Sequence, residues 1–270
     1  MLKRQKMFAT ILLTAAAMLW LLTGCATQLP SDIQLDELEK KMALAIDPEG
    51  VYRNAESYYQ RQNVIEKGFF SDTMQQVEVR FQRPDKFKFS YYEKNLPVRE
   101  LLCLGSKAWN IDHNKGTVTE ITGDALEKFR IMLALGHPDT DYDKLFAKVE
   151  IFLTKLEDGK DYYQLICHPA LKGANPITVY VDKNTFLHKR MELTVNTANG
   201  SKSSVSDIES YRKFGKLNLA ELTRVTESDR EYTTRIVEYH LNAPFSSETF
   251  KLPVFDPVLM EMKKQQERLR

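Results

Sequence analysis

The residue whose chemistry is best defined by its neighbours is Cys25. Three of the first six residues are basic, an apolar run extends from Met7 to Leu22, and the small residues Thr23 and Gly24 precede the cysteine. This order is the basic start, apolar middle and small-residue cleavage site of an export signal. The run is shorter than the ~20 residues that a membrane-spanning helix needs, and no basic stop-transfer flank follows it. We therefore predict a signal peptide over residues 1–24, cleaved between Gly24 and Cys25.

The segment Leu22-Thr23-Gly24-Cys25 resembles the lipobox of bacterial lipoproteins, in which the cysteine thiol takes a diacylglyceryl group and a dedicated peptidase cuts before it. Only a thiol can form this thioether, and small residues at positions 23 and 24 let the peptidase reach the bond. The resemblance implies lipidation of Cys25 by acyl chains such as palmitate. The alternatives are an uncleaved signal anchor with a chance cysteine, or cleavage at a site such as Ala15-Ala16-Ala17.

A lipidated Cys25 implies that acyl chains hold the protein on a membrane. At ~0.8 kcal/mol per buried methylene, one chain binds weakly whereas two or three bind firmly. Residues 25–32 then form a lipidated tether, which reaches roughly 20 Å at ~3.3 Å per residue. Ala26 follows the cysteine, whereas an Asp there marks inner-membrane retention in the enteric rule. We expect a lipid-anchored protein of the cell envelope, at the outer membrane facing the periplasm rather than at the inner membrane.

Charge and composition limit the partners of the mature chain. The full sequence has 38 basic and 37 acidic residues, and removal of residues 1–24 takes away three basic and no acidic ones, so the formal charge falls from +1 to −2. That balance does not favour a nucleic-acid partner. The chain is 43% hydrophobic and no linker divides it, so we predict one domain over residues 33–256. Residues 257–270 are mostly polar and are predicted to form a helical tail.

The sequence carries no recognisable catalytic or metal-binding pattern. Its five histidines are dispersed without metal-ligand spacing, and no GxSxG, P-loop or dinucleotide fingerprint occurs. Asp139 and Asp141 lie in a proline-containing loop, where capping or turn formation explains them. Cys103 and Cys167 lie in apolar runs and are expected to be buried free thiols; a disulfide is the alternative if their Cα atoms lie within about 7 Å. We expect no enzyme, no metal and no cofactor.

Two segments have the spacing of helices. Ser31 and Asp32 offer caps for a helix over residues 33–46, which has apolar residues at helical spacing and ends at Asp47-Pro48-Glu49-Gly50. A second, strongly apolar helix is predicted over residues 123–135, before Gly136-His137-Pro138 stops it.

Most of the remaining chain alternates apolar and polar residues, which indicates half-buried strands joined by short turns such as Asn199-Gly200. About ten such strands with one apolar face need a cover. We therefore predict an α+β fold that is mainly antiparallel β: a strongly curved, incomplete β-barrel covered by an N-terminal and a central helix. Two packed sheets are the alternative.

One family has similar motifs in the same order. Arg83-Pro84-Asp85-Lys86-Phe87 resembles the Arg-Pro-x-Lys/Arg-Phe strand start of the LolA-like outer-membrane lipoprotein carrier and sorting proteins. Residues 109–112, 181–187, 208–215 and 245–253 are similar to later segments of that family, so the resemblance spans roughly residues 33–253. A proline usual after the late Gly-Leu stretch is absent at Leu219-Ala220. The lipobox makes this chain similar to the membrane-held type rather than to the free carrier.

The resemblance implies an open half-barrel whose apolar hollow accepts lipid or the acyl chains of a lipoprotein, with a role in lipoprotein sorting or outer-membrane biogenesis. Tyr58-Tyr59 and Tyr91-Tyr92 are either ligand contacts or plain sheet core, the latter being favoured. The alternative function is a structural or protein-interaction lipoprotein with a filled core and an envelope protein partner. The candidate cavity-lining residues are Val77, Val79, Phe81, Phe87, Phe89, Tyr91, Met191 and Leu193.

Overall fold

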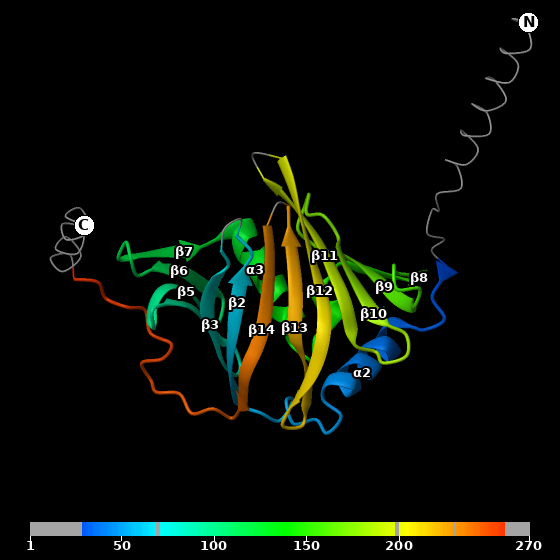
Figure 1. Ribbon diagram of the computed structural model, residues 1–270, viewed down its shortest axis with the longest axis horizontal. Helices are drawn as coiled ribbons and strands as arrows, with labels where there is room; N and C mark the ends of the chain where they lie inside the picture. The colour runs from blue at the N-terminus through cyan, green and yellow to red at the C-terminus, as the bar shows by residue number, and fades with distance from the viewer. Residues whose placement is uncertain (1–28, 69–70, 198–199, 229, 257–270) are drawn as a thin grey trace, which may run out of the picture.

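The computed structural model describes residues 29–68, 71–197, 200–228 and 230–256 (Figure 1). The predicted signal peptide, Cys25, the start of the tether and the tail over residues 257–270 lie outside these residues. None of the helices within them is both long enough and apolar enough to cross a membrane.

The described residues form a single curved sheet of fourteen strands, all paired antiparallel, more than the ten or so that the sequence suggested. The strands are β1 (Leu29–Pro30), β2 (Ser57–Glu66), β3 (Thr73–Gln82), β4 (Lys86–Glu93), β5 (Leu96–Leu104), β6 (Lys107–Asp112), β7 (Thr117–Ile121), β8 (Lys148–Lys155), β9 (Asp161–His168), β10 (Ile177–Asp182), β11 (His188–Thr197), β12 (Gly200–Phe214), β13 (Leu217–Glu227) and β14 (Arg230–Leu241). The predicted curved and unclosed antiparallel architecture is confirmed, as one sheet and not two.

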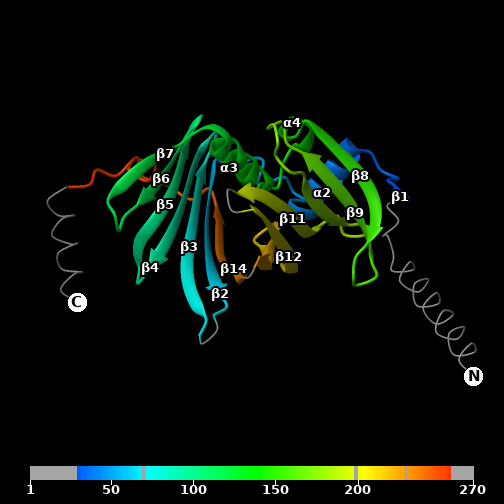
Figure 2. The ribbon, with the colours of Figure 1, turned by 90° about the horizontal axis from the view of Figure 1, so that it is seen from above.

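Two meanders make up this sheet, β2 to β7 and β8 to β14, and the pairing of β14 with β2 joins them. The short strand β1 pairs with β8 at one edge, and β7 forms the other edge. Seen from above, the two meanders form two wings around a concave side, on which the helices lie (Figure 2).

Three helices cover the concave side: α2 (Leu35–Ile46), α3 (Gly123–Leu135) and α4 (Tyr142–Leu145). The bounds of α3 are those predicted, but α2 begins two residues later than expected and neither proposed cap serves it. Its N-cap is Gln34, which makes no side-chain cap bond. Ser31 instead accepts a hydrogen bond from the Ile33 amide (3.1 Å), and Asp32 pairs with Lys183 (2.8 Å). Asp141 does act as a cap, because its carboxylate accepts from the Lys144 amide at the start of α4.

The concave side holds two separate apolar clusters. In what we call the first core, α2 and α4 pack on β9 and β10; in the second core, α3 packs on β2 to β6. The buried residues of the first core are Ile33, Leu38, Met42, Tyr142, Phe146, Tyr163, Leu165, Cys167, Ile177, Val179 and Val181. Those of the second core are Tyr52, Tyr58, Val79, Phe81, Phe87, Cys103, Ala108 and Leu217.

Cys103 and Cys167 therefore lie in different cores, and both thiols are free, as predicted. Burial raises the pKa of Cys167 to about 12, so its thiol stays protonated and unreactive at neutral pH. A third cluster covers the other face of β5 and β6, where Phe250 of the C-terminal segment packs on Leu102 and Ile111.

Candidate binding cavity

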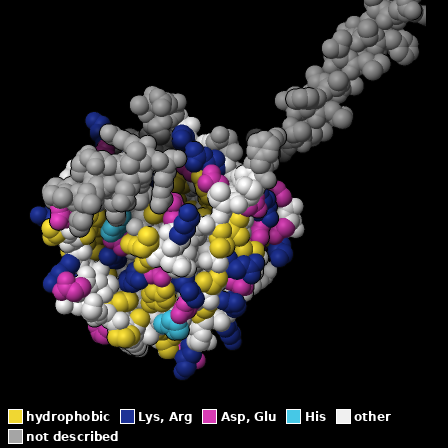
Figure 3. All heavy atoms as spheres, turned by 60° about the vertical axis from the view of Figure 1, so that its left-hand side comes forward, with side chains coloured by type: hydrophobic (Ala, Val, Ile, Leu, Met, Phe, Trp, Pro, Cys, Tyr) yellow, Lys and Arg dark blue, Asp and Glu magenta, His cyan; other side chains and the backbone are white. Residues whose placement is uncertain are grey.

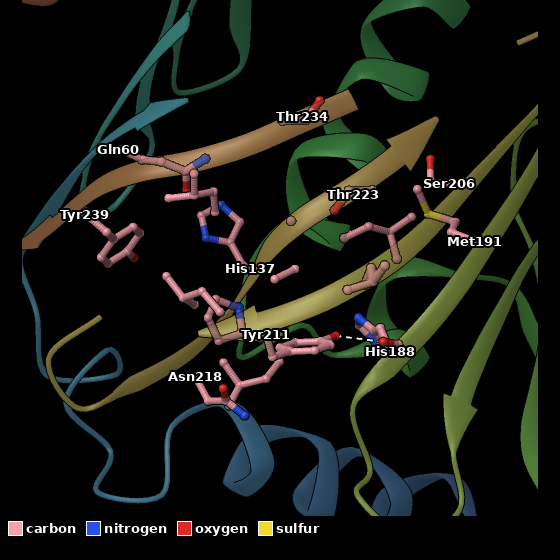
Figure 4. Close-up of a pocket in the computed structure, with 18 of the residues that line it drawn as sticks. Gln60, His137, His188, Met191, Ser206, Tyr211, Asn218, Thr223, Thr234 and Tyr239 are labelled. Carbon is pink, nitrogen blue, oxygen red and sulfur yellow. Dashed lines mark hydrogen bonds between the residues drawn. The ribbon is translucent and has the colours of Figure 1, made fainter. Parts of the chain in front are cut away.

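A cavity of about 340 Å³ lies on the concave side between the two cores. Its floor consists of the central strands β12, β13 and β14, where the short side chains of Ser206, Ala220, Thr223 and Thr234 lie between longer ones such as Ile208 and Ile236. Thr223 lies opposite Ile208 on one neighbouring strand and opposite Thr234 on the other. Because protein interiors normally pack without gaps, short side chains between two large-residue cores leave an open space (Figure 4).

Aromatic residues form the wall on the side of the second core. The rings of Tyr58 and Tyr239 stack at 5.4 Å between centroids, and Tyr52 makes a hydrogen bond with Nδ1 of His137. Burial raises the pKa of Tyr58 and of Tyr239 well above the ordinary range, so both hydroxyls are neutral. Burial also lowers the pKa of His137, which favours the neutral imidazole.

Two β-bulges direct tyrosines into this cavity. The β12–β13 register shifts after Ile208, and the β14–β2 register shifts after Ile236. Without an extra residue, strict alternation would turn Tyr211 and Tyr239 to the opposite face from Ile208 and Ile236, yet all four line the cavity. Such a shift has no marked signal in the sequence, which is why alternation alone did not identify these two tyrosines.

The wall on the side of the first core includes His188, Tyr142, Met191 and Val179. The hydroxyl of Tyr211 donates to the His188 carbonyl at 2.7 Å (Figure 4), and the Tyr142 hydroxyl lies 3.3 Å from Nε2 of His188. Desolvation lowers the pKa of His188 to about 4, so the imidazole is neutral at physiological pH.

Arg83, the first residue of the Arg83-Pro84 motif, fixes the loop that carries Tyr52. Its Nε donates to the Ala55 carbonyl at 2.8 Å and its Nη2 to the Tyr52 carbonyl at 3.2 Å. The same guanidinium lies 3.5 Å from a carboxylate oxygen of Asp139, in the loop after α3. The motif thus ties two loops of the cavity wall together, which is a structural role.

No protein-family model matches the sequence, and no curated protein matches it. Solved structures do share its architecture. A DUF1329 family protein from Desulfovibrio piger is 14% identical with a TM-score of 0.56, over 80% of this chain and 95% of that one. A LolA superfamily protein from Nitrosomonas europaea is 10% identical with a TM-score of 0.55, over 82% of this chain and 98% of that one. The chain has a LolA-like fold. A domain from Vibrio parahaemolyticus, named for outer membrane lipoprotein sorting, is 14% identical with a TM-score of 0.54, over 80% of this chain and 95% of that one.

Only one of the eight predicted lining residues reaches this cavity of the LolA-like sheet. Met191 lines it, whereas Leu193 lines a separate hollow of about 110 Å³ beside α3. Val79, Phe81 and Phe87 are buried in the second core, and Phe89 packs against it. Val77 is fully buried and Tyr91 lines a small surface groove instead.

The physical reason is the position of α3. This helix covers the wing formed by β2 to β6, and its apolar side chains Leu126, Phe129 and Leu133 pack into the second core. The large residues of β3 and β4 therefore meet a helix, while the floor formed by β12 to β14, with short side chains at Ser206, Thr223 and Thr234, faces the open space. Tyr58, one of the tyrosines noted from the sequence, does line the cavity, and Tyr59 does not.

Among the residues that the structure describes, no group of three or more His, Cys, Asp or Glu side chains is placed to hold a metal ion. The cavity wall offers aliphatic surface together with neutral hydroxyl, amide and imidazole groups.

Proposed function

We propose that this chain is a membrane-anchored lipoprotein of the bacterial cell envelope that binds lipid, or the acyl chains of a lipoprotein, in the cavity between its two cores. The observation that carries the proposal is the cavity itself, which interrupts an otherwise packed concave side. The names of two structural neighbours, a LolA superfamily protein and a lipoprotein-sorting domain, support a role in lipoprotein sorting or outer-membrane biogenesis.

The size of the cavity limits what it holds in this conformation. Ligand pockets span about 300–1,000 Å³, and a volume of about 340 Å³ is at the low end of that range. Aliphatic side chains of Val179, Met191 and Ile208 offer contact for a hydrocarbon chain, which gains ~0.8 kcal/mol per buried methylene. A single chain fits this space, and the several chains of a whole lipoprotein require the two wings to separate.

The anchor in this proposal is the acylated Cys25, at an outer membrane facing the periplasm. The face of the molecule drawn in Figure 3 has basic and acidic side chains interspersed. This pattern does not provide a large basic patch on that face for anionic headgroups, and in this proposal the acyl chains supply the membrane affinity.

Filling the cavity tests the proposal. Thr223→Phe places a ring over the cavity floor, whereas Thr226→Phe adds the same ring to an exposed position on the same strand. After purification from cells, mass spectrometry of extracted lipid should find a bound lipid in the wild type and in Thr226→Phe, and much less in Thr223→Phe. Equal lipid in all three proteins, or none in the wild type, would refute the proposal.

A second candidate is an interaction lipoprotein that recruits an envelope protein. The edge strand β7 supports it, because four of its five residues are exposed and its outer side is unpaired within the described sheet. Edge strands can accept an added strand from a partner. Crosslinking in cells from a photoreactive residue at Thr119 would then capture one defined protein, with no lipid recovered from the purified chain.

A further inference from the structure

The floor and one wall of the cavity carry hydroxyl groups that the fold does not use. The hydroxyls of Tyr58, Tyr239, Ser206, Thr223 and Thr234 have no hydrogen-bond partner among the described residues, although all five side chains line the cavity. Covering an unpartnered hydroxyl with hydrocarbon costs more free energy than burying one methylene returns. A ligand that is only an acyl chain is therefore a poor match for this surface.

The cavity also lacks a free charge. Among the described residues that line it, the one side chain with a permanent charge is Arg190, whose guanidinium is held by Asp207 (2.7 Å) and Glu157 (3.1 Å). His137 and His188 are neutral, because burial lowers the pKa of each. A charged headgroup would lose its hydration here without gaining an opposite charge.

The two ends of the cavity differ in their lining: one holds Tyr58, Gln60 and Tyr239, and the other holds Val179 and Met191 together with Ser206, which lies directly opposite Met191. Gln60 lies directly opposite Tyr239 on β2 and β14, next to the Tyr58 ring. Met191 lies opposite Val179 on β11 and β10. Figure 4 shows Gln60 and Tyr239 at one side and Met191 at the other. The Gln60 amide donates to the Gln62 carbonyl oxygen at 2.9 Å, which leaves the Gln62 amide group without a partner in the described chain.

We propose that the cavity binds a single-chain amphiphile whose neutral headgroup carries several hydroxyl groups, such as a sugar or glycerol. Its headgroup lies between Tyr58, Gln60 and Tyr239 and over the floor hydroxyls of Thr223 and Thr234, and its chain lies against Val179 and Met191. This inference rests on the proposed lipid-binding function and names the class of ligand for the same cavity.

Calorimetric titration of the mature chain with three probes tests this assignment. The protein is produced without residues 1–24 and carries Cys25→Ser, so that it needs no processing and has no acyl chains of its own that could compete. The probes are octyl glucoside, octanoate and dioctanoyl phosphatidylcholine, each below its micellar concentration. Octyl glucoside should bind with 1:1 stoichiometry, at least about tenfold more tightly than the anionic probe or the two-chain probe.

Variants of single hydroxyls locate the headgroup. Tyr239→Phe and Thr234→Val each remove one unpartnered hydroxyl with little change in shape, and each should weaken octyl glucoside binding about five- to tenfold. Tyr232→Phe, on the same strand but outside the cavity lining, should leave the affinity unchanged. Thermal unfolding of each variant checks that the domain is intact.

The outcomes separate the two proposals. Octanoate or the two-chain lipid binding as tightly as octyl glucoside would overturn the headgroup assignment and keep lipid binding in the cavity. Equal effects of Tyr239→Phe and Tyr232→Phe would overturn it as well. If none of the probes binds and no lipid is extracted from the wild-type protein, the proposed function itself fails.

Discussion

At the scale of single residues, the cavity depends on side-chain length at the centre of the sheet. The neighbours of this region in the two cores are large, such as Leu165 and Phe81, whereas the central strands carry Ser206, Thr223 and Thr234. The two β-branched threonines favour strands, yet all three side chains are too short to fill the space above the sheet. Their hydroxyls make the space polar as well as open.

In the proposed function, Cys25 carries the membrane anchor. Cys25→Ser removes the only group at this position that can form a thioether, so the precursor should accumulate uncut and the membrane-bound fraction should fall. Thr23→Ser keeps a small residue in the same segment and should be processed normally. Gel mobility of the precursor and membrane fractionation measure both effects. A Cys25→Ser protein that is still cut at the same bond and still sediments with membranes would contradict the prediction.

His188 should make the stability of the fold depend on pH. The pKa of its side chain is lowered to about 4 in the folded protein, against an ordinary value of 6.5, so the unfolded state binds a proton more readily. The contribution of the neutral imidazole to the free energy of unfolding is fully present above pH 6.5 and is lost as the pH falls toward 4. At pH 4.5 the loss amounts to at most about 2–3 kcal/mol.

Urea unfolding at pH 7.5 and pH 4.5 measures this difference. His188→Gln should lose less stability between the two pH values than the wild type does. Tyr211→Phe removes the hydrogen bond to the His188 carbonyl without changing any group that titrates in this range. It should lower stability at both pH values and keep the wild-type difference. A His188→Gln protein with the full wild-type pH dependence would show that His188 is not the source.

At the scale of secondary-structure elements, α3 links the two cores. Leu126, Phe129 and Leu133 pack on the second core, while Ile131 and Leu135 pack on the first. The helix therefore bridges the two wings of the sheet beside the cavity, and residues Leu135 to Pro138 at its end contribute to the cavity wall.

Shortening Phe129 should weaken this bridge. Phe129→Ala leaves a gap against the second core and should cost about 2–3 kcal/mol, below the value for a fully buried phenylalanine because the ring is only partly buried. Glu127→Ala, two residues earlier, removes only an exposed ion pair with Arg130 and should cost less than about 0.5 kcal/mol. Chemical denaturation of both variants measures the difference, and equal destabilisation would mean that α3 does not hold the wings.

Both long helices and the strand-rich character of the chain follow from the periodicity of the sequence, but the position of the cavity does not. The apolar spacing over residues 123–135 predicts α3, and the alternation in residues 77–81 predicts β3. Which apolar residues are covered depends on where α3 lies, and that is set by contacts far apart in the chain. The bulges after Ile208 and Ile236 reverse the alternation locally, so the pattern assigns Tyr211 and Tyr239 to the wrong face.

At the scale of the whole molecule, the cavity and the first strand after Cys25 lie in different parts of one sheet. The cavity lies over the central strands, whereas β1 lies at the β8 edge, four residues after Cys25. Four residues span about 14 Å at most when extended. An acylated Cys25 would therefore hold the β8 edge close to the bilayer, while β7, at the opposite end of the sheet, remains available to other molecules.

Few contacts hold β1 against β8. Reversing the charge of Asp32, next to β1, therefore tests how firmly this strand is attached. Leu29 and Pro30 pair with Leu153 and Phe152, and the Asp32–Lys183 ion pair (2.8 Å) holds the segment that follows. Asp32→Lys replaces this attraction with repulsion. It should increase hydrogen exchange at residues 152–153 about two- to fivefold, the effect expected for an exposed ion pair.

Asp36→Lys is the matched control, because Asp36 forms its ion pair with the exposed Lys40 of the same helix. It should leave exchange in β8 unchanged. Loss of β1 also uncovers a sheet edge, and uncovered edges tend to pair with one another. Sedimentation of Asp32→Lys should then detect more dimer than in the control. If exchange and sedimentation match the control, backbone pairing with β8 is enough to hold β1, and the Asp32–Lys183 ion pair does not contribute.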